Sequence, residues 1–199
     1  MRHVPSANTR DLHADFANDL ADALLPQASY DVRKWLFVPP RYEEYRFILG
    51  TRGQHPLICV GVNPSTATPD RLDRTLESVE RIARHNGFDS FLMFNVSAQR
   101  ATDPDLMDAE LDEGLHRENL KAFDYLLSLS ESPVVWAAWG AVIEKRPYLS
   151  ACVRDLWQIG QKHRAVWVHC GPLSKRGHPH HPLYLKSDSP LTPFEWKSE

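Results

Sequence analysis

Four short apolar runs, separated by longer segments, constrain the fold of this chain more than any other feature. They span residues 57–62, 90–95, 134–139 and 165–170. Each run has the length of one buried strand, and the segments between them carry apolar residues at helical spacing. Strands that alternate with helices predict a parallel sheet with helices on both faces. We therefore predict an α/β fold with a mostly parallel central sheet of about four strands.

Four helices are expected around these runs, over residues 8–26, 68–86, 108–129 and 147–161. Asn8 or Thr9 is suited to cap the first helix, which we place outside the main sheet. Thr68 followed by Pro69 is typical of a helix start, because proline fits the first helical position. The chain thus supplies one helix for each connection between successive strands.

The segment before the first apolar run contains another strand pattern. Tyr45 and Phe47 alternate with charged or polar neighbours, which favours a strand over 45–49. The turn at 51–53 then predicts an antiparallel edge hairpin between this strand and residues 57–62. We expect residues 1–41 to form an accessory segment with the N-terminal helix. Residues 42–199 are expected to form a single α/β domain.

Composition limits the classes of partner. The chain has 199 residues and a net charge of −3, so it is not a general binder of polyanions. No apolar run approaches the roughly 18 residues of a membrane span, and we expect no membrane partner. Cys59, Cys152 and Cys170 are odd in number and scattered. They favour a reduced, cytoplasmic protein without a disulfide framework.

Polar residues follow the carboxyl end of every predicted strand. They are Asn63 and Ser65, Asn95 and Arg100, Gly140, and the basic loop around Lys175 and Arg176 that leads into His181. Any one of them is explained equally well as a turn former or a helix cap. The carboxyl ends of parallel strands share one edge of the sheet, where α/β proteins bind ligands. Together these residues predict a binding site.

His178, His180 and His181 form an H-x-H-H cluster, and such clusters can bind zinc. The prolines at 179 and 182 interrupt the cluster, and its spacing matches no closed zinc module. We therefore expect one functional histidine beside solvent-facing ones, and neither a metal nor another cofactor.

Several ordered motifs resemble those of a largely bacterial and phage family catalogued as a domain of unknown function. They are NPSTA at 63–67, D-x-T at 73–75, N-x-x-A-x-R-A-T-x-P at 95–104, AWG at 138–140 and HPLYL at 181–185. The resemblance covers about residues 42–186. It implies family membership without naming a reaction.

The order of motifs also resembles that of the uracil-DNA glycosylase superfamily. GVNPS resembles its first motif, FLMFN the strand before its base-reading Asn, VVWAAWG its strand ending in WG, and HPL the start of its HPS loop. The resemblance implies a three-layer α/β/α sandwich. It assigns Asn63 to the attacking water, Asn95 to the edge of the base and His181 to the departing base.

The remaining substrate contacts that we predict are Ser65, Thr66, Arg100, Trp139, Gly140, Lys175, Arg176, Leu183 and Tyr184. Arg100 and the Lys175-Arg176 pair are expected to contact phosphate. Leu183 stands where the superfamily has a Ser that grips the nucleic-acid backbone, and either Leu183 or Leu185 is available as an apolar wedge.

Three functions remain open at this point. The first is an enzyme that acts on a nucleobase or its N-glycosidic bond, in a nucleic acid or a free nucleotide. The second is a non-catalytic module that binds a modified base or nucleotide in the same pocket. The third is a zinc-dependent hydrolase that uses the histidine cluster. Because the chain is acidic, single-stranded or modified nucleic acid fits better than plain duplex.

Overall fold

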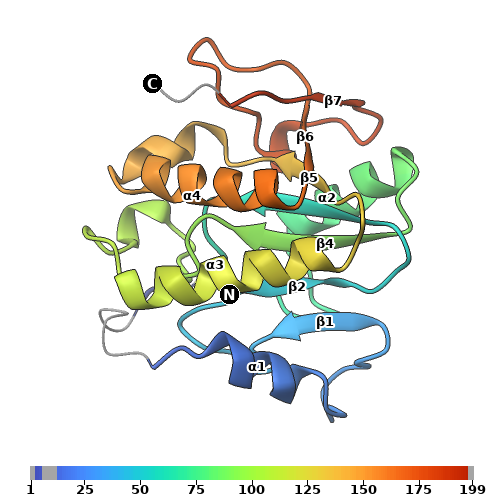
Figure 1. Cartoon of the computed structure of the whole chain (residues 1–199), viewed down its shortest axis with the longest axis vertical. Helices are drawn as coiled ribbons and strands as arrows, with labels where there is room; N and C mark the ends of the chain where they lie inside the picture. The colour runs from blue at the N-terminus through green and yellow to red at the C-terminus, as the bar shows by residue number, and fades with distance from the viewer. Residues whose placement is uncertain (1–2, 6–12, 197–199) are drawn as a thin grey trace.

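The computed structural model describes residues 3–5 and 13–196, and in these residues seven strands form one mixed sheet (Figure 1). The spatial order is β1-β2-β4-β3-β5-β6-β7. The strands are β1 Trp35–Val38, β2 Ile48–Thr51, β3 Pro56–Gly61, β4 Ser90–Asn95, β5 Val134–Ala137, β6 Val166–Cys170 and β7 Leu191–Pro193.

The four central strands β4, β3, β5 and β6 run parallel to one another. They correspond to the four apolar runs, so the predicted parallel core is confirmed. Gly61 at the end of β3 lies beside Asn95 at the end of β4 in the register of that pair. The carboxyl ends of the two strands that carry the first two motifs therefore meet at one edge of the sheet.

The predicted hairpin between residues 45–49 and 57–62 is wrong. β2 pairs antiparallel with β1 on one side and with β4 on the other. Both edges of β3 are occupied by its parallel partners, so β2 takes the remaining edge of β4. Gly50 permits the close pairing, because a Cβ there would lie 2.0 Å from the carbonyl oxygen of Phe91. The edge hairpin is β1–β2, and neither β1 nor β7 was predicted.

Four α-helices pack on the two faces of the sheet: α1 Phe16–Ala23, α2 Arg74–His85, α3 Glu113–Ser128 and α4 Leu149–Lys162. Helices α1, α3 and α4 contribute to one apolar cluster, and α2 contributes to the cluster on the opposite face (Figure 1). Short 3-10 helices span Pro104–Leu106 (η2), Gly140–Lys145 (η3) and Pro182–Tyr184 (η4). The expectation of helices on both faces is thus confirmed.

Helix α2 begins later than the predicted cap at Thr68. Its N-cap is Asp73, whose carboxylate accepts hydrogen bonds from the backbone N–H groups of Thr75 and Leu76. Thr68 instead exchanges two backbone hydrogen bonds with Arg71, which closes a turn before the helix. The Asp side chain is among the strongest N-caps, and it outcompetes the Thr-Pro signal. The predicted cap of α1 at Asn8 or Thr9 lies outside the described residues.

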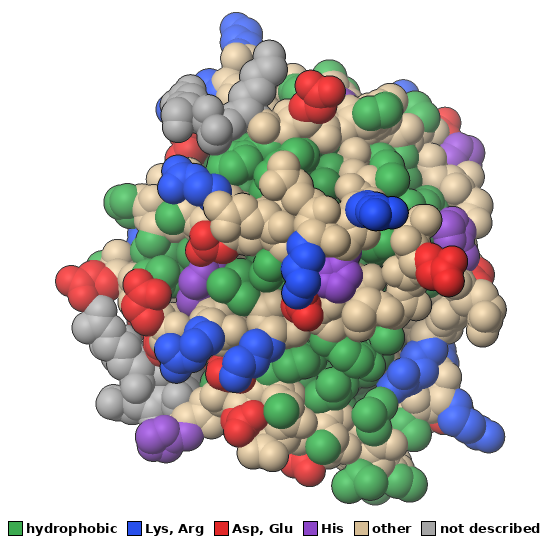
Figure 2. All heavy atoms as spheres, in the orientation of Figure 1, with side chains coloured by type: hydrophobic (Ala, Val, Ile, Leu, Met, Phe, Trp, Pro, Cys, Tyr) green, Lys and Arg blue, Asp and Glu red, His purple; other side chains and the backbone are tan. Residues whose placement is uncertain are grey.

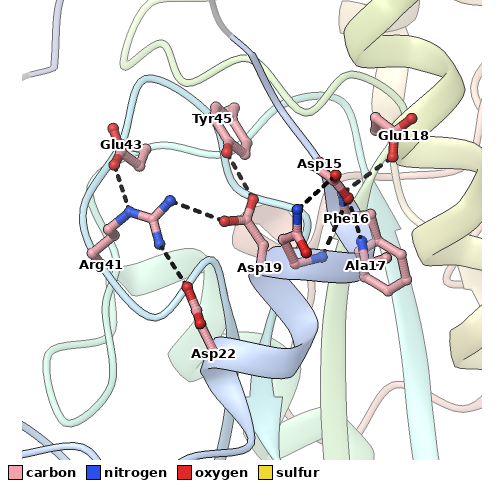
Figure 3. A network of polar contacts seen from close by, with 10 residues as sticks. Asp15, Phe16, Ala17, Asp19, Asp22, Arg41, Glu43, Tyr45 and Glu118 are labelled. Carbon is pink, nitrogen blue, oxygen red and sulfur yellow. Dashed lines mark hydrogen bonds and ion pairs between the residues drawn. The ribbon is translucent and has the colours of Figure 1, made fainter.

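Helix α1 is attached to the sheet by a network of polar contacts (Figure 3). The buried carboxylate of Asp19 accepts hydrogen bonds from Tyr45 at 2.7 Å and from Arg41 at 3.0 Å. The backbone N–H of Phe16 donates to Glu118 on α3 at 3.1 Å. Each buried polar group that α1 brings to the interface therefore has a partner.

The division into an accessory segment 1–41 and a domain 42–199 stays a prediction, although β1 within the first segment is an edge strand of the main sheet. In the described part of the chain, no helix combines the length and apolar character needed to cross a membrane. Cys59, Cys152 and Cys170 are all buried free thiols.

Candidate functional site

The carboxyl ends of β3 and β4 open into a cleft of about 410 Å³. Its lining includes Asn63, Ser65, Thr66, Asn95 and His181, which come from three separate segments of the chain. The sequence predicted all five as site residues, and the fold brings them together. The topology explains this, because parallel strands deliver the residues that follow them to the same edge.

Asn95 presents an unpartnered amide at the inner end of the cleft. The residue is 1% exposed, and neither Nδ2 nor Oδ1 has a hydrogen-bond partner among the described residues. Its main chain is held by Asn119 of α3, which donates to the carbonyls of Asn95 and Val96 at 3.0 and 3.2 Å. Gly61 leaves room beside the amide, since a Cβ there would lie 3.1 Å from Oδ1. The backbone is fixed while the side-chain amide stays available.

Asn63 joins the turn after β3 to the segment after β4. Its Nδ2 donates to the carbonyls of Ala101 at 2.7 Å and Pro64 at 3.1 Å. The hydroxyls of Ser65 and Thr102 lie 3.2 Å apart and reinforce the same junction. Because both amide hydrogens are occupied, Asn63 offers a ligand or a water its Oδ1 acceptor.

His181 caps η4 and faces the cleft from a third side. Its Nδ1 accepts a hydrogen bond from the backbone N–H of Leu183 at 3.4 Å, so the neutral ring carries its proton on Nε2. Burial lowers the pKa of His181 below its usual 6.5, and the nearby negative charge of Asp73 opposes this shift. The imidazole therefore presents a neutral N–H donor at pH 7. Gly140, which has a φ of +62°, lies against His181: a Cβ at position 140 would be 3.4 Å from the Cβ of His181.

Two arginines are buried next to the cleft. Arg46 is 1% exposed and lines it; its Nη1 donates to the carbonyl of Ala67 at 3.3 Å. Arg100 donates to the carbonyl of Ser65, and its guanidinium lies 4.3 Å from the ring centre of Tyr42. Desolvation lowers the pKa of Arg46 to about 9, with a smaller contribution from the charge of Arg100. Desolvation also lowers the pKa of Arg100 to about 10.

The comparisons with known proteins can now be placed on this geometry. Residues 46–183 match the model of a family described as Protein of unknown function (DUF1643). The chain belongs to this family. No significant match was found among curated proteins or among solved structures. The DUF1643 segment contains every cleft residue described above, and the predicted family membership is confirmed.

Within the DUF1643 segment, sequence reasoning missed the three charged residues that line the cleft: Arg46, Asp73 and Arg74. Asp73 belongs to the D-x-T motif, so a signal existed, but the motif suggested no role. Arg46 lies in the alternating pattern before β2, and that pattern suggested no role for its side chain. In the fold this side chain is buried at the cleft, and the Ala67 carbonyl accepts a hydrogen bond from its Nη1.

Other predicted contacts lie outside the cleft. Trp139 is buried in the core, with ring contacts to Trp167 and Phe194. Lys175 and Arg176 are exposed, and Arg176 pairs with Glu144 at 2.5 Å. Leu183 and Tyr184 are exposed on η4 and follow His181 directly. Arg100 supports the cleft wall from behind. The binding roles predicted for these residues stay predictions.

The histidine cluster is divided between two places. His178 bonds to Glu144 on η3, whereas His181 faces the cleft. Across residues 3–5 and 13–196, no group of three or more His, Cys, Asp or Glu side chains is arranged to hold a metal ion. The zinc-hydrolase alternative therefore has no support in the geometry.

Charge is evenly distributed on the face covered by α1, α3 and α4. Figure 2 shows Lys and Arg side chains interspersed with Asp and Glu across this face. Such a surface offers no extended basic footprint for a duplex. Any recognition of nucleic acid is better sought at the cleft.

Proposed function

We propose that the cleft recognises a nucleobase, with Asn95 binding the edge of the base. The observation that carries this proposal is the buried Asn95 amide, whose donor and acceptor both lack a partner in the described structure. A buried polar group without a hydrogen bond costs about 1–3 kcal/mol. A protein retains such a group most readily where a ligand completes its hydrogen bonds.

The chemistry of the amide indicates the class of ligand. A side-chain amide offers an N–H donor beside a C=O acceptor, and it pairs in a bidentate manner with a group of the reverse pattern. The edge of a pyrimidine such as uracil carries a carbonyl beside an N–H. Enzymes that act on an extruded base read this edge by hydrogen bonds.

The motif resemblance to the uracil-DNA glycosylase superfamily supports the same proposal. Asn63, Asn95 and His181 carry that resemblance, and all three line one cleft. Asn63 and His181 are more than 100 positions apart in the chain, and their presence in one cleft supports the roles that the resemblance implies.

We extend the proposal to hydrolysis of the N-glycosidic bond. As the bond to the base breaks, negative charge develops on the base, and the Nε2–H of His181 donates a hydrogen bond to it. A neutral imidazole suits this role, because its Nε2–H can hydrogen-bond to the base anion while the proton stays on the ring. Asn63 orients the attacking water through Oδ1.

A second candidate function is a base-binding module without catalysis. It is favoured by Asn63, because an amide cannot act as a strong general base and both of its hydrogens are already committed to backbone carbonyls. The two candidates share the Asn95 contact and differ in whether product forms.

The test is a binding and cleavage screen against single- and double-stranded oligonucleotides that carry uracil or other altered bases, alongside free nucleotides. His181→Ala is compared with His180→Ala, a neighbouring histidine that does not line the cleft. Base release that is lost in His181→Ala and kept in His180→Ala supports the glycosidic reaction. Binding without release supports the module. If the wild type shows neither binding nor base release with any of these ligands, the proposal is overturned.

A further inference from the structure

We propose that Arg46 and Arg74 form an anion-binding subsite next to Asn95, and that this subsite takes a phosphate group of the ligand. The inference adds to the proposed function by giving the ligand a phosphate, and it rests on that function only for the base half of the ligand.

Arg46 provides the first observation. Its guanidinium is buried and lines the cleft, and no described residue accepts a hydrogen bond from its Nε. Among the described residues, the one hydrogen bond of the guanidinium is to the Ala67 carbonyl, a neutral acceptor. A buried guanidinium without a bound carboxylate retains unused donors, and its planar fork can donate two parallel hydrogen bonds to two oxygens of a phosphate.

Arg74 provides a second cation at the mouth of the same cleft. It occupies the first position of α2, a helix of 12 residues, and its side chain is exposed. Within the described parts of the chain, no carboxylate pairs with Arg74 or with the neighbouring Arg71.

A second cleft of about 410 Å³ adjoins the first and gives the phosphate a path outward. It is lined by Tyr42, Arg71 and Glu77, and it shares Thr66, Asp73 and Arg74 with the first cleft. Arg74 therefore stands on the wall between the two spaces. A base bound at Asn95 can extend its sugar and phosphate past this residue.

The basic residues that the sequence suggested for phosphate are engaged elsewhere or lie away from the cleft. Arg176 pairs with Glu144. Arg100 does not line the cleft; it donates to the Ser65 carbonyl and lies over the ring of Tyr42. Arg46 and Arg74 are the cations that line the cleft itself. Asp73 also lines the cleft and its charge acts on Arg46, so a bound phosphate competes with this carboxylate for the guanidinium.

The experiment compares three probes on the whole protein by calorimetry: deoxyuridine, its 5′-monophosphate and a short single-stranded oligonucleotide that contains uracil. Inorganic phosphate is used in a parallel thermal-shift series. Arg74→Gln is matched by Arg84→Gln, which removes the same charge from the other end of α2, where Arg84 pairs with Glu80. Arg46→Gln tests the buried arginine of the subsite. If Arg46→Gln does not fold, the exposed Arg74→Gln still tests the proposal.

We expect a probe that carries a phosphate to bind about tenfold or more tightly than the nucleoside, because charged hydrogen bonds are the strong ones. This advantage should shrink at high salt and disappear in Arg74→Gln, while Arg84→Gln keeps it. Preference for the monophosphate indicates a terminal phosphate, and preference for the oligonucleotide indicates a phosphodiester.

Two results overturn the inference. One is nucleoside binding that gains nothing from phosphate, which leaves the proposed function intact. The other is phosphate stabilisation that is equal in wild type, Arg74→Gln and Arg84→Gln. A third result would separate the two proposals. If the phosphate effect depends on Arg74 but Asn95→Leu binds every probe as tightly as the wild type, the subsite is supported and base recognition is overturned.

Discussion

Buried polar groups have opposite surroundings in two regions of the molecule, the α1 interface (Figure 3) and the strand-end cleft. At the α1 interface, Asp19 accepts hydrogen bonds from both Tyr45 and Arg41. In the cleft, the Asn95 amide and the Nε of Arg46 have no partner in the described structure. The α1 interface is a polar network whose hydrogen bonds are complete, whereas the polar groups of the cleft still have unused donors and acceptors.

This difference separates polar residues that stabilise the fold from those that await a ligand. Removing one member of a completed network leaves its partners unsatisfied and destabilises the protein. Removing an unpartnered group relieves a desolvation penalty, so stability is unchanged or rises while binding is lost. Substitutions in the two regions should therefore affect stability in opposite directions.

The largest effect is expected for Asp19→Ala. The change leaves the hydroxyl of Tyr45 buried without an acceptor and removes the buried partner of Arg41. We expect a loss of about 3 kcal/mol in the free energy of unfolding, measured by urea denaturation. Asp22→Ala is the control, because Asp22 is exposed and contacts Arg41 only at 3.7 Å. Equal effects of the two substitutions would contradict the importance of the network.

A matched pair of Asn→Leu substitutions provides the sharpest version of the comparison. Asn119 and Asn95 are both buried, but only Asn119 donates to backbone carbonyls. Asn119→Leu should lower the free energy of unfolding by about 2 kcal/mol, since it leaves those carbonyls without a donor. Asn95→Leu should leave stability unchanged or raise it by about 1 kcal/mol, and should abolish ligand binding.

Urea denaturation and calorimetry of the two variants check this prediction. If Asn95→Leu destabilises the protein as strongly as Asn119→Leu, Asn95 has a structural role. The contrast between the two regions would then fail at its central residue.

The smallest expected effect is the pH dependence that His181 contributes. Burial lowers its pKa below 6.5 in the folded state, so the unfolded state binds more protons as the pH falls. The stability contributed by the neutral ring is therefore complete above pH 6.5 and is lost as the pH falls through the folded-state pKa. His181→Gln should lack this acid-side loss.

Two measurements test the pH dependence. NMR titration should place the His181 midpoint below 6.5, and urea denaturation should show the wild type losing stability relative to His181→Gln as the pH falls. A midpoint above 6.5 would mean that the charge of Asp73 outweighs desolvation. His181 would then be a cation near pH 6, with a different role in the cleft.

Much of the candidate site was predictable because it depends on the local pattern at strand ends. Asn63 and Asn95 each follow an apolar run, and parallel topology requires such residues to meet. Asp73, Arg46 and Arg74 were missed for a different reason. A charged residue in a strand or helix pattern is ordinarily assigned to solvent, and only the path of the surrounding loops decides whether it is buried.

The sequence by itself determined the four parallel strands, the helices that connect them and the family, because apolar periodicity and short motifs are properties of neighbouring residues. Only the tertiary structure decided that β2 pairs with β4, that β1 and β7 extend the sheet, and that Arg46 enters the cleft. Those outcomes depend on which strand edges remain free and which polar groups find partners. Such competition takes place between segments far apart in the chain, where the local pattern carries no information.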